Sequence, residues 1–370
     1  MPNSTRSYLN PSKLTPTPGG NVGSKLLPNY QAITNGKQLV STTQHQKLRL
    51  LGKGGQGMVY GSERQGSDQF KLRVALKIFS PEPYPDDERY CEDMARMADI
   101  ASRVVLIQHD NLVGIQNFVD QDGIRILEME CIDGFDLREL LSERMLATTR
   151  ARAVPAGWEY INRVVVTDGP VQPRLKPGTA IQVLRECLAG LGALHRAGIV
   201  HGDLKPSNIM LKRTGNIKLI DLGSAVNMGS TAARPMWSPA YTAPEVLAGA
   251  PNSPQADLAS LGYILVEMLA GQSPFEGLTT YRELLAAKTE LDHKLPDFLP
   301  EEVSRNELLL HLCGRLIASE PARRFSDAQA ADSDREGAAD FHRQLVKYDL
   351  SSEYATDFRR WLEHVNRTND

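Results

Sequence analysis

His201-Gly202-Asp203-Leu204-Lys205-Pro206-Ser207-Asn208 is the stretch that organises this 370-residue chain. The carboxylate of Asp203 could orient an incoming hydroxyl group and accept its proton. Lys205 follows two residues later in a segment predicted to be extended, so its ammonium can neutralise a moving phosphoryl group on the same side. Asn208 lies five residues after Asp203, and an amide oxygen at that distance can hold a Mg²⁺ ion. A polar turn would explain an isolated Asp-x-Lys-Pro, so the flanking sequence decides between the two interpretations.

A second candidate metal ligand follows the next predicted strand. Asp221-Leu222-Gly223 comes directly after an apolar strand predicted over 216–220. A carboxylate between a strand end and a flexible glycine can meet a Mg²⁺ ion there. Asn208 and Asp221 would then supply two oxygen ligands, while phosphates and waters fill the rest of an octahedron.

A glycine-rich turn lies near the start of the ordered chain, and its sequence is Gly52-Lys53-Gly54-Gly55-Gln56-Gly57. Glycines let the backbone bend tightly and bring its amides close to phosphate oxygens. Met58, Val59 and Tyr60 continue as a strand, which places Val59 over a base. A dinucleotide-binding turn would lead directly into a helix, so this pattern excludes that class, and no Walker phosphate-binding motif is present.

The strand predicted around 70–79 carries Val74-Ala75-Leu76-Lys77-Ile78. A lysine among apolar residues must direct its ammonium out of the apolar wall, and a phosphate is a suitable partner. An exposed lysine on an edge strand is the alternative.

These motifs, in this order, resemble the protein kinase family in its serine/threonine branch. The family patterns are His-Arg-Asp-x-Lys-x-x-Asn, Asp-Phe-Gly and Val-Ala-Ile-Lys. Further matches are the segment Trp237 to Glu245, which contains Tyr-x-Ala-Pro-Glu, and Asp257-Leu258-Ala259-Ser260-Leu261-Gly262. The resemblance covers about residues 47–330, and Lys205 favours the serine/threonine branch. Gly202 stands where the family usually has an arginine that receives an activation-loop phosphate, so phosphorylation at Ser230 or Thr231 is expected to have a modest effect.

The resemblance implies an α+β, two-lobed kinase fold with a small β-rich lobe and a larger, mainly helical lobe. The expected division is a disordered leader over 1–45, the small lobe over 46–132 and the large lobe over 133–336. An insertion is expected at about 143–176. Two amphipathic helices are expected in a tail over 337–370, where apolar residues recur at helical spacing. They would pack on the large lobe or form a partner or dimer surface.

The resemblance also assigns roles to individual residues. Asp203 becomes the catalytic base, Lys205 and Lys77 bind phosphates, and Asn208 and Asp221 bind Mg²⁺. The remaining nucleotide-binding residues are Gly52, Gly54, Gly57, Val59, Ala75, Glu130, Ile132, Asp136 and Met210. Within this set Glu130 and Ile132 would meet adenine through their backbone and Asp136 would face the ribose, with Met129 as gatekeeper. Asp257 is expected to hold the catalytic-loop backbone, Arg324 to pair with Glu245, and the Ser238 hydroxyl to bridge Asp203 and Lys205.

One family position has no match. Kinases carry a glutamate on the helix after the lysine strand, here predicted near 86–107, to pair with that lysine. Counting back from His109 places this position on Ile100. Asp99 is adjacent and is our choice, and Glu92 lies on about the same helical face, because seven residues make close to two turns. If neither reaches Lys77, another partner must hold it.

Composition sets the remaining limits. The net charge of −3 gives no electrostatic reason to expect nucleic acid or an anionic membrane as a partner. Four separated cysteines without a CxxC pair favour a reducing cytoplasm. The longest apolar run, Leu258 to Ala270, is too short to span a bilayer.

The sequence thus predicts a kinase that transfers the γ-phosphoryl group of MgATP to Ser or Thr hydroxyls of proteins. A small-molecule kinase is disfavoured by Ala243-Pro244-Glu245 and Asp257. A pseudokinase that serves as a binding module is the alternative, which retention of Lys77, Asp203, Asn208 and Asp221 makes weaker.

Overall fold

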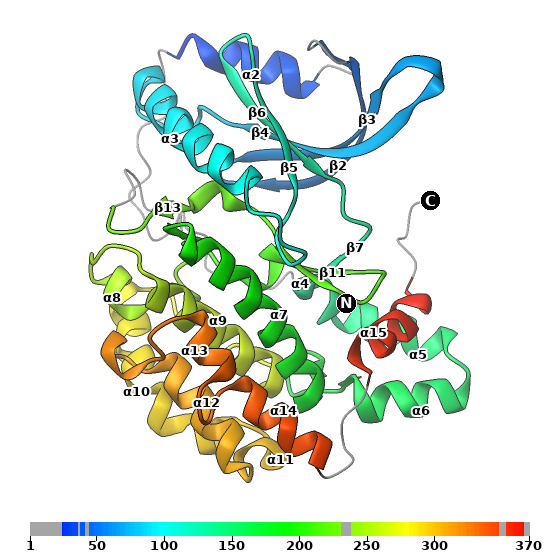
Figure 1. Cartoon of the computed structure of the whole chain (residues 1–370), viewed down its shortest axis with the longest axis vertical. Coiled ribbons are helices and arrows are strands. Elements are labelled where there is room, and N and C mark those ends of the chain that lie inside the picture. The colour runs from blue at the N-terminus through cyan, green and yellow to red at the C-terminus, as the bar shows by residue number, and fades with distance from the viewer. Residues whose placement is uncertain (1–23, 36–37, 41–43, 231–237, 348–352, 366–370) are drawn as a thin grey trace.

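The computed structural model describes residues 24–35, 38–40, 44–230, 238–347 and 353–365. Two lobes are stacked along the long axis of the molecule (Figure 1). The upper lobe is built on a β-sheet, and the lower lobe consists mainly of helices. The α+β, two-lobed architecture expected from the sequence is confirmed.

The small lobe is built on one antiparallel sheet with the strand order β1-β2-β3-β4-β6-β5. The strands are β1 (Gln38–Val40), β2 (Gln44–Gly54), β3 (Gly57–Gln65), β4 (Lys71–Phe79), β5 (Ile115–Gln121) and β6 (Ile124–Glu130). The glycine-rich turn joins β2 to β3, and a 3₁₀ turn (Ser67–Gln69) lies between β3 and β4. Val59 on β3 pairs with Lys77 on β4, so the glycine-rich turn lies beside the lysine strand.

Helix α3 (Asp87–Val105) packs against this sheet through Met94, Met97 and Tyr90. Asp86 caps its first turn by accepting a hydrogen bond from the Arg89 amide at 2.7 Å. The buried face of the helix is therefore apolar, while most of its acidic residues lie outside the core.

A further helix, α2 (Leu26–Asn35), falls within the segment predicted to be disordered, so that prediction is wrong for these residues. Tyr30 and Ile33 are buried against apolar residues of strands β4 and β6. Ser24 accepts hydrogen bonds from the first turn of α2 and donates to Asp87 of α3 at 2.5 Å. Residues 1–23 of the predicted leader lie outside the described residues.

The large lobe surrounds two buried helices, α7 (Pro177–Arg196) and α9 (Pro254–Ala270). Leucine and isoleucine side chains at helical spacing form the buried side of α7, and nearly all of α9 is buried. Ser253 caps the start of α9, and Gly271 ends it in the left-handed conformation. Around them lie α8 (Pro244–Leu247), α10 (Tyr281–Phe298), α11 (Glu301–Ser304), α12 (Glu307–Ile317), a 3₁₀ turn (Pro321–Arg323) and α13 (Ala328–Ser333).

Short strands position the catalytic loop between the lobes. Strand β10 (Ile199–Val200) leads into the loop and pairs with β13 (Val226–Asn227). A 3₁₀ turn (Pro206–Asn208) ends the loop, and β11 (Ile209–Lys212) follows it. Strand β11 lies between β12 (Ile217–Leu219) and β7 (Gly134–Asp136), and a 3₁₀ turn (Leu222–Ser224) comes after β12.

The predicted insertion has regular structure. Helix α4 (Leu137–Leu140) precedes it, and it forms α5 (Glu143–Arg152), α6 (Pro155–Val164) and the paired strands β8 (Val166–Thr167) and β9 (Arg174–Leu175). Ser142 caps α5, and Pro155 is the first residue of α6. The helices are short, so their apolar period is weak in the sequence.

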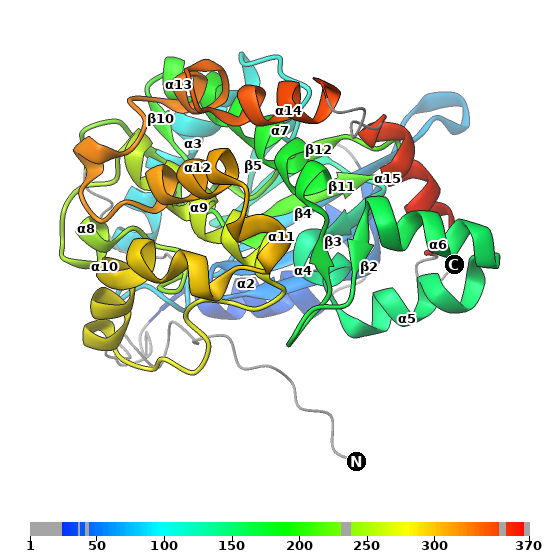
Figure 2. The same cartoon turned by 90° about the horizontal axis from the view of Figure 1, so that it is seen from below.

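The two predicted C-terminal helices are α14 (Ala338–Lys347) and α15 (Tyr354–Glu363). Figures 1 and 2 both show α15 beside α5 and α6. The indole of Trp361 donates to Thr149 Oγ1 at 3.1 Å, and the Tyr160 hydroxyl donates to Asp357 at 2.7 Å. The apolar residues of α15, for which the sequence left packing on the large lobe or a partner surface open, are buried within the chain itself.

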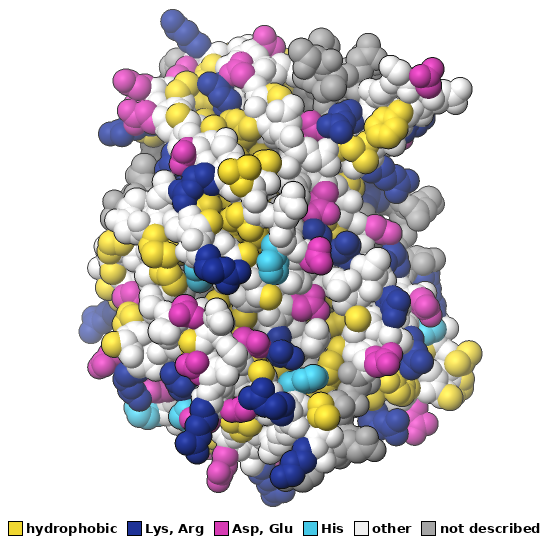
Figure 3. Space-filling view, in the orientation of Figure 1, with side chains coloured by type: hydrophobic (Ala, Val, Ile, Leu, Met, Phe, Trp, Pro, Cys, Tyr) yellow, Lys and Arg dark blue, Asp and Glu magenta, His cyan; other side chains and the backbone are white. Residues whose placement is uncertain are grey.

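Among the described residues, no helix combines the length and the apolar character that a membrane crossing needs. Basic and acidic side chains alternate over the face shown in Figure 3.

Candidate active site

The catalytic loop (201–208) brings Asp203 and Lys205 together with the segment 238–245, which we call the substrate-side loop. Asp203 Oδ2 accepts a hydrogen bond from Lys205 Nζ at 2.6 Å, and Asp203 Oδ1 accepts one from the Ser238 amide at 2.9 Å. Lys205 Nζ also donates to Ser238 Oγ at 3.1 Å. The predicted bridge at position 238 is therefore made by two groups, because the hydroxyl contacts Lys205 and the backbone amide contacts Asp203.

Asp257 holds the backbone of this loop, as the sequence predicts. Its carboxylate accepts hydrogen bonds from the amides of His201 at 2.8 Å and Gly202 at 2.9 Å. His195 Nε2 contacts the same carboxylate at 2.9 Å. His201 is fully buried and its ring faces the Ile220 carbonyl, so it is a packed loop residue.

The two predicted metal ligands lie on adjoining segments. Asn208 is buried, and its amide nitrogen donates to the Asp203 carbonyl at 2.8 Å, so its oxygen is the atom suited to ligate a metal. Asp221 has a left-handed backbone (φ 62°), and it accepts a hydrogen bond from the Gly223 amide at 3.1 Å. One carboxylate and one amide oxygen are hard ligands that suit Mg²⁺ when phosphates and waters complete its shell.

Lys77 from the small lobe meets Asp221 from the large lobe. Its ammonium is buried and forms an ion pair with Asp221 Oδ1. Burial alone would raise the pKa of Asp221, but Lys77 outweighs that effect, and Lys205 and the Gly223 amide also lower it, so the pKa falls to about 2. Asp221 is thus kept as a carboxylate that can bind a cation.

Neither of the carboxylates of helix α3 that were predicted to pair with Lys77 does so. Asp99 is exposed, and Glu92 is exposed and pairs with Arg89 at 2.8 Å. The prediction that Asp99 or Glu92 pairs with Lys77 is therefore wrong. The reason is the rotation of α3, which turns Met97 and Ile100 into the core and leaves the neighbouring carboxylate outside.

The glycines of the phosphate-binding turn differ in their surroundings. A side chain at Gly52 or Gly54 would meet nothing within 4 Å, so both face open space. Gly57 has φ 139°, and a Cβ there would lie 2.0 Å from the Ile78 carbonyl oxygen. Only glycine fits at 57, where it lets the turn lie directly on β4.

Four of the predicted nucleotide-binding residues belong to one apolar cluster with the expected gatekeeper Met129, and they are Val59, Ala75, Ile132 and Met210. Ala75, Val113, Met129 and Ile132 are buried together. Val59, Met210 and Ile220 pack against them. Side chains from β3, β4, β6 and β11 thus gather in one apolar cluster near the link between the lobes, and apolar side chains typically line a site for a planar base.

Two predicted nucleotide residues also have structural contacts. The Glu130 carboxylate accepts hydrogen bonds from the Gly114 amide and from Lys218 Nζ, each at 2.6 Å, which fixes the link between the lobes. Asp136 caps α4 by accepting from the Glu139 amide at 2.8 Å, and burial raises its pKa. The sequence gives no sign that Lys218 binds Glu130, because the direction of the Lys218 side chain depends on the pairing of β11 with β12.

Beneath the substrate-side loop lies a group of buried charged residues. Arg324 and Glu245 form the predicted pair, which is bidentate, with hydrogen bonds of 2.6 and 2.8 Å. Lys288 on α10 is buried between the rings of Tyr263 and Phe275, and its Nζ donates to the Ala240 carbonyl at 2.6 Å. Sequence analysis missed Lys288, which looks like any polar residue of an amphipathic helix.

Gly202 occupies a constrained position. Its φ is 76°, and a Cβ there would lie 2.8 Å from the Ser224 carbonyl oxygen. Of the two candidate phosphorylation sites, Ser230 donates to the Asn227 carbonyl at 2.6 Å, and Thr231 lies outside the described residues.

Comparisons with known proteins agree with this geometry. The protein kinase domain model matches residues 45–334. The serine/threonine-protein kinase PrkC of Bacillus subtilis is 27% identical over 307 residues, which cover 81% of this chain and 41% of that protein. PknL of Mycobacterium tuberculosis is 30% identical over 302 residues, which cover 78% of this chain and 64% of PknL. The chain thus matches less than two thirds of the length of either relative. The matched domain and the motifs gathered at the site show that this chain belongs to the protein kinase family.

Proposed function

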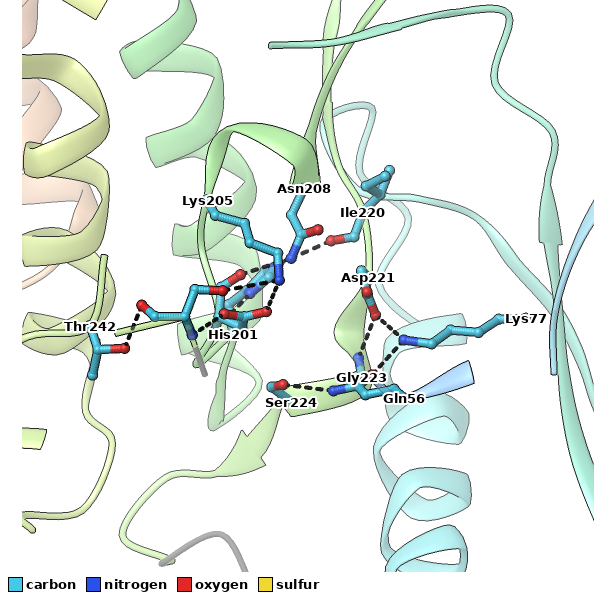
Figure 4. A network of polar contacts seen from close by, with 12 residues as sticks. Gln56, Lys77, His201, Lys205, Asn208, Ile220, Asp221, Gly223, Ser224 and Thr242 are labelled. Atoms are coloured by element: carbon cyan, nitrogen blue, oxygen red, sulfur yellow. Dashed lines mark hydrogen bonds and ion pairs between the residues drawn. The ribbon is translucent and has the colours of Figure 1, made fainter. Parts of the chain in front are cut away.

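We propose that this chain transfers the γ-phosphoryl group of MgATP to Ser or Thr hydroxyls of proteins. The observation that carries the proposal is that the catalytic loop of the large lobe lies beside the ion pair between Lys77 of the small lobe and Asp221 (Figure 4). Asp203, Lys205 and Asn208 lie on one loop, and Lys77 reaches Asp221 beside it. The relatives named above are serine/threonine-protein kinases, which agrees with this assignment.

Each residue has a role that its contacts support. Asp203, held by Lys205 and by the Ser238 amide, would orient the substrate hydroxyl and accept its proton. Lys205 would neutralise the phosphoryl group during transfer, and Lys77 would hold the inner phosphates. The apolar cluster of Val59, Ala75, Ile132 and Met210 would receive adenine.

Asn208 and Asp221 would hold the metal ion. Mg²⁺ bound there would neutralise phosphate charge during the transfer. The lowered pKa of Asp221 supports this role, because the group stays ionised at any physiological pH.

Protein substrates would bind beside the loop that contains Ser238. This loop is anchored from below by Lys288 and by the Arg324–Glu245 pair. We also propose a cytoplasmic location, which the four free and separated cysteines support.

The test is transfer of labelled γ-phosphate from MgATP to a basic protein and to the chain itself. Asp203→Ala is the control variant, and phosphoamino acid analysis identifies the acceptor. We expect label on Ser or Thr that disappears in the variant. Absence of transfer by folded, nucleotide-binding wild type would overturn the proposal and favour a pseudokinase.

A further inference from the structure

Helix α3 provides no acidic partner for Lys77, although the ammonium is buried. Among the described residues, the acceptors that contact Lys77 Nζ are Asp221 and the side chain of Gln56. The acidic residues of α3 are exposed or engaged elsewhere; Asp93, for example, accepts hydrogen bonds from Arg96 and Tyr84. A buried cation needs acceptors, so the contact with Gln56 is a functional candidate.

Gln56 comes from the glycine-rich turn, and both ends of its amide are engaged. Its Oε1 accepts a hydrogen bond from Lys77 Nζ at 2.5 Å, and its Nε2 donates to Ser224 Oγ at 2.9 Å. Figure 4 shows the amide lying between Lys77 and Ser224. The Gln56 carbonyl also accepts from the Ser80 amide at 2.9 Å, so the backbone that carries the side chain is fixed to the end of β4.

The space for this amide depends on Gly223. A Cβ at position 223 would lie 1.9 Å from Gln56 Oε1 and 2.6 Å from Lys77 Nζ. The glycine after Asp221 therefore lets the amide and the ammonium lie against the backbone of this turn. Gly52, Gly54 and Gly55 face open space, so the turn keeps a free side for phosphates.

We propose that Gln56 is a positioning residue for phosphoryl transfer. It holds Lys77 in the place of the carboxylate that other kinases carry on the helix equivalent to α3. The inference rests on the proposed function, in which Lys77 binds phosphates. A neutral amide accepts a hydrogen bond without placing a second negative charge, after that of Asp221, beside the ammonium, so it weakens the attraction of Lys77 for phosphate less than another carboxylate would. Through Ser224 the same amide ties the glycine-rich turn to the segment that carries Asp221.

The test is a double-mutant cycle on nucleotide binding, measured by titration calorimetry with MgADP. The proteins are wild type, Gln56→Met, Lys77→Met and the double variant. If Gln56 acts through Lys77, Gln56→Met should weaken binding about tenfold in the wild-type background, and it should have no effect once Lys77 is gone. Gln65→Met, an exposed glutamine on the same hairpin, is the matched control and should bind as wild type does.

Two results would overturn the inference. Tighter binding by Gln56→Met would mean that the amide competes with nucleotide for Lys77. An equal loss in both backgrounds would mean that Gln56 acts independently of Lys77. Steady-state kinetics add a second readout, because the KM for ATP should rise while the KM for the protein substrate stays constant. Because the cycle measures binding, it stays informative even if wild type transfers no phosphate.

Discussion

Asp203 and Asp221 both follow short strands of the large lobe, but their partners come from different parts of the molecule. Asp203 is held by Lys205 and Ser238, so this catalytic half of the site lies within the large lobe. Asp221 is held by Lys77, and Lys77 by Gln56, so this nucleotide half combines both lobes. The catalytic half therefore needs one folded lobe, whereas the nucleotide half also needs the lobes in their observed arrangement. Regulation that moves the small lobe would act on the nucleotide half first.

The largest expected effects separate these halves directly. Asp203→Asn should lower kcat by about 10²–10⁴-fold, because it removes the general base, and it should leave MgADP affinity unchanged. Asp221→Asn should instead abolish the dependence of nucleotide affinity on Mg²⁺. Calorimetry with and without the metal, combined with phosphate transfer, measures both. Equal loss of nucleotide affinity in the two variants would contradict the separation.

Loss of the Arg324–Glu245 pair, which supports the catalytic half, should lower the free energy of unfolding strongly. Arg324→Met leaves Glu245 as a charge without its bidentate partner, and such losses cost about 3–5 kcal/mol. Urea unfolding of wild type and variant measures the difference. Arg323→Met, its exposed neighbour, is the control and should unfold as wild type does. A small effect at both positions would show that the substrate-side loop does not depend on this pair.

Lys288 should give the catalytic half a pH dependence of its own. Burial, and then the nearby Arg324, lower the pKa of Lys288 well below its usual 10.5. Between the folded and unfolded pKa values the unfolded chain binds more protons, so stability rises with pH, by up to about 1.4 kcal/mol per unit. Urea unfolding at successive pH values should show this rise in wild type and a weaker one in Lys288→Met. Lys294→Met, an exposed lysine of the same helix, should keep the wild-type slope.

Gly202 is one point where the two halves touch, because a Cβ added there would face the Ser224 carbonyl oxygen. Gly202→Ala should cost more than the ~1–2 kcal/mol of a left-handed alanine, since Ser224 must also move. Gly229 has a similar φ of 80° with open space around it, so Gly229→Ala measures the backbone cost alone. Thermal and urea unfolding compare the two. Equal losses would show that Ser224 yields without cost.

The smallest expected effect tests the small lobe alone. Ser24→Ala removes the cap of helix α2 and its hydrogen bond to Asp87, which should cost about 1 kcal/mol. Nucleotide affinity should fall slightly, because the nucleotide half includes the small lobe. The hydrogen bonds of the catalytic half should not change, because they lie in the other lobe. Ser102→Ala, on the exposed side of α3, is the control. Unchanged stability would show that α2 is not held by its cap.

The sequence located Asp203 and Asn208 on the catalytic loop, and Asp221 in the nucleotide half, because the placement of each depends on local sequence. The spacing from Asp203 to Asn208, and the place of Asp221 after a strand, fix these groups whatever surrounds them. The partner of Lys77 could not be predicted in this way. A helix rotated by one residue exchanges Asp99 for Ile100, and nothing local sets that rotation, while the direction of Gln56 depends on where its turn meets Gly223.

The same limit explains the other differences. Helix α2 lies in a polar segment, and the surface that orders Tyr30 and Ile33 comes from β4 (Lys71–Phe79) and β6 (Ile124–Glu130), which lie much later in the chain. Helices α5 and α6 are short, and they are completed by α15 from the far end of the chain. Composition and period describe a segment by itself, so they miss order that is conferred by a distant partner.

The contact between Trp361 and Thr149 has a consequence for the folding of this protein during its synthesis on the ribosome. The two residues are 212 positions apart, and Tyr160 and Asp357 are 197 apart. At about 5–20 residues per second, α5 and α6 leave the ribosome roughly 10–40 s before α15. During this interval their apolar faces are uncovered and open to chaperones. A nascent chain that stops before α15 would keep this surface exposed, and proteases could distinguish it from the finished kinase.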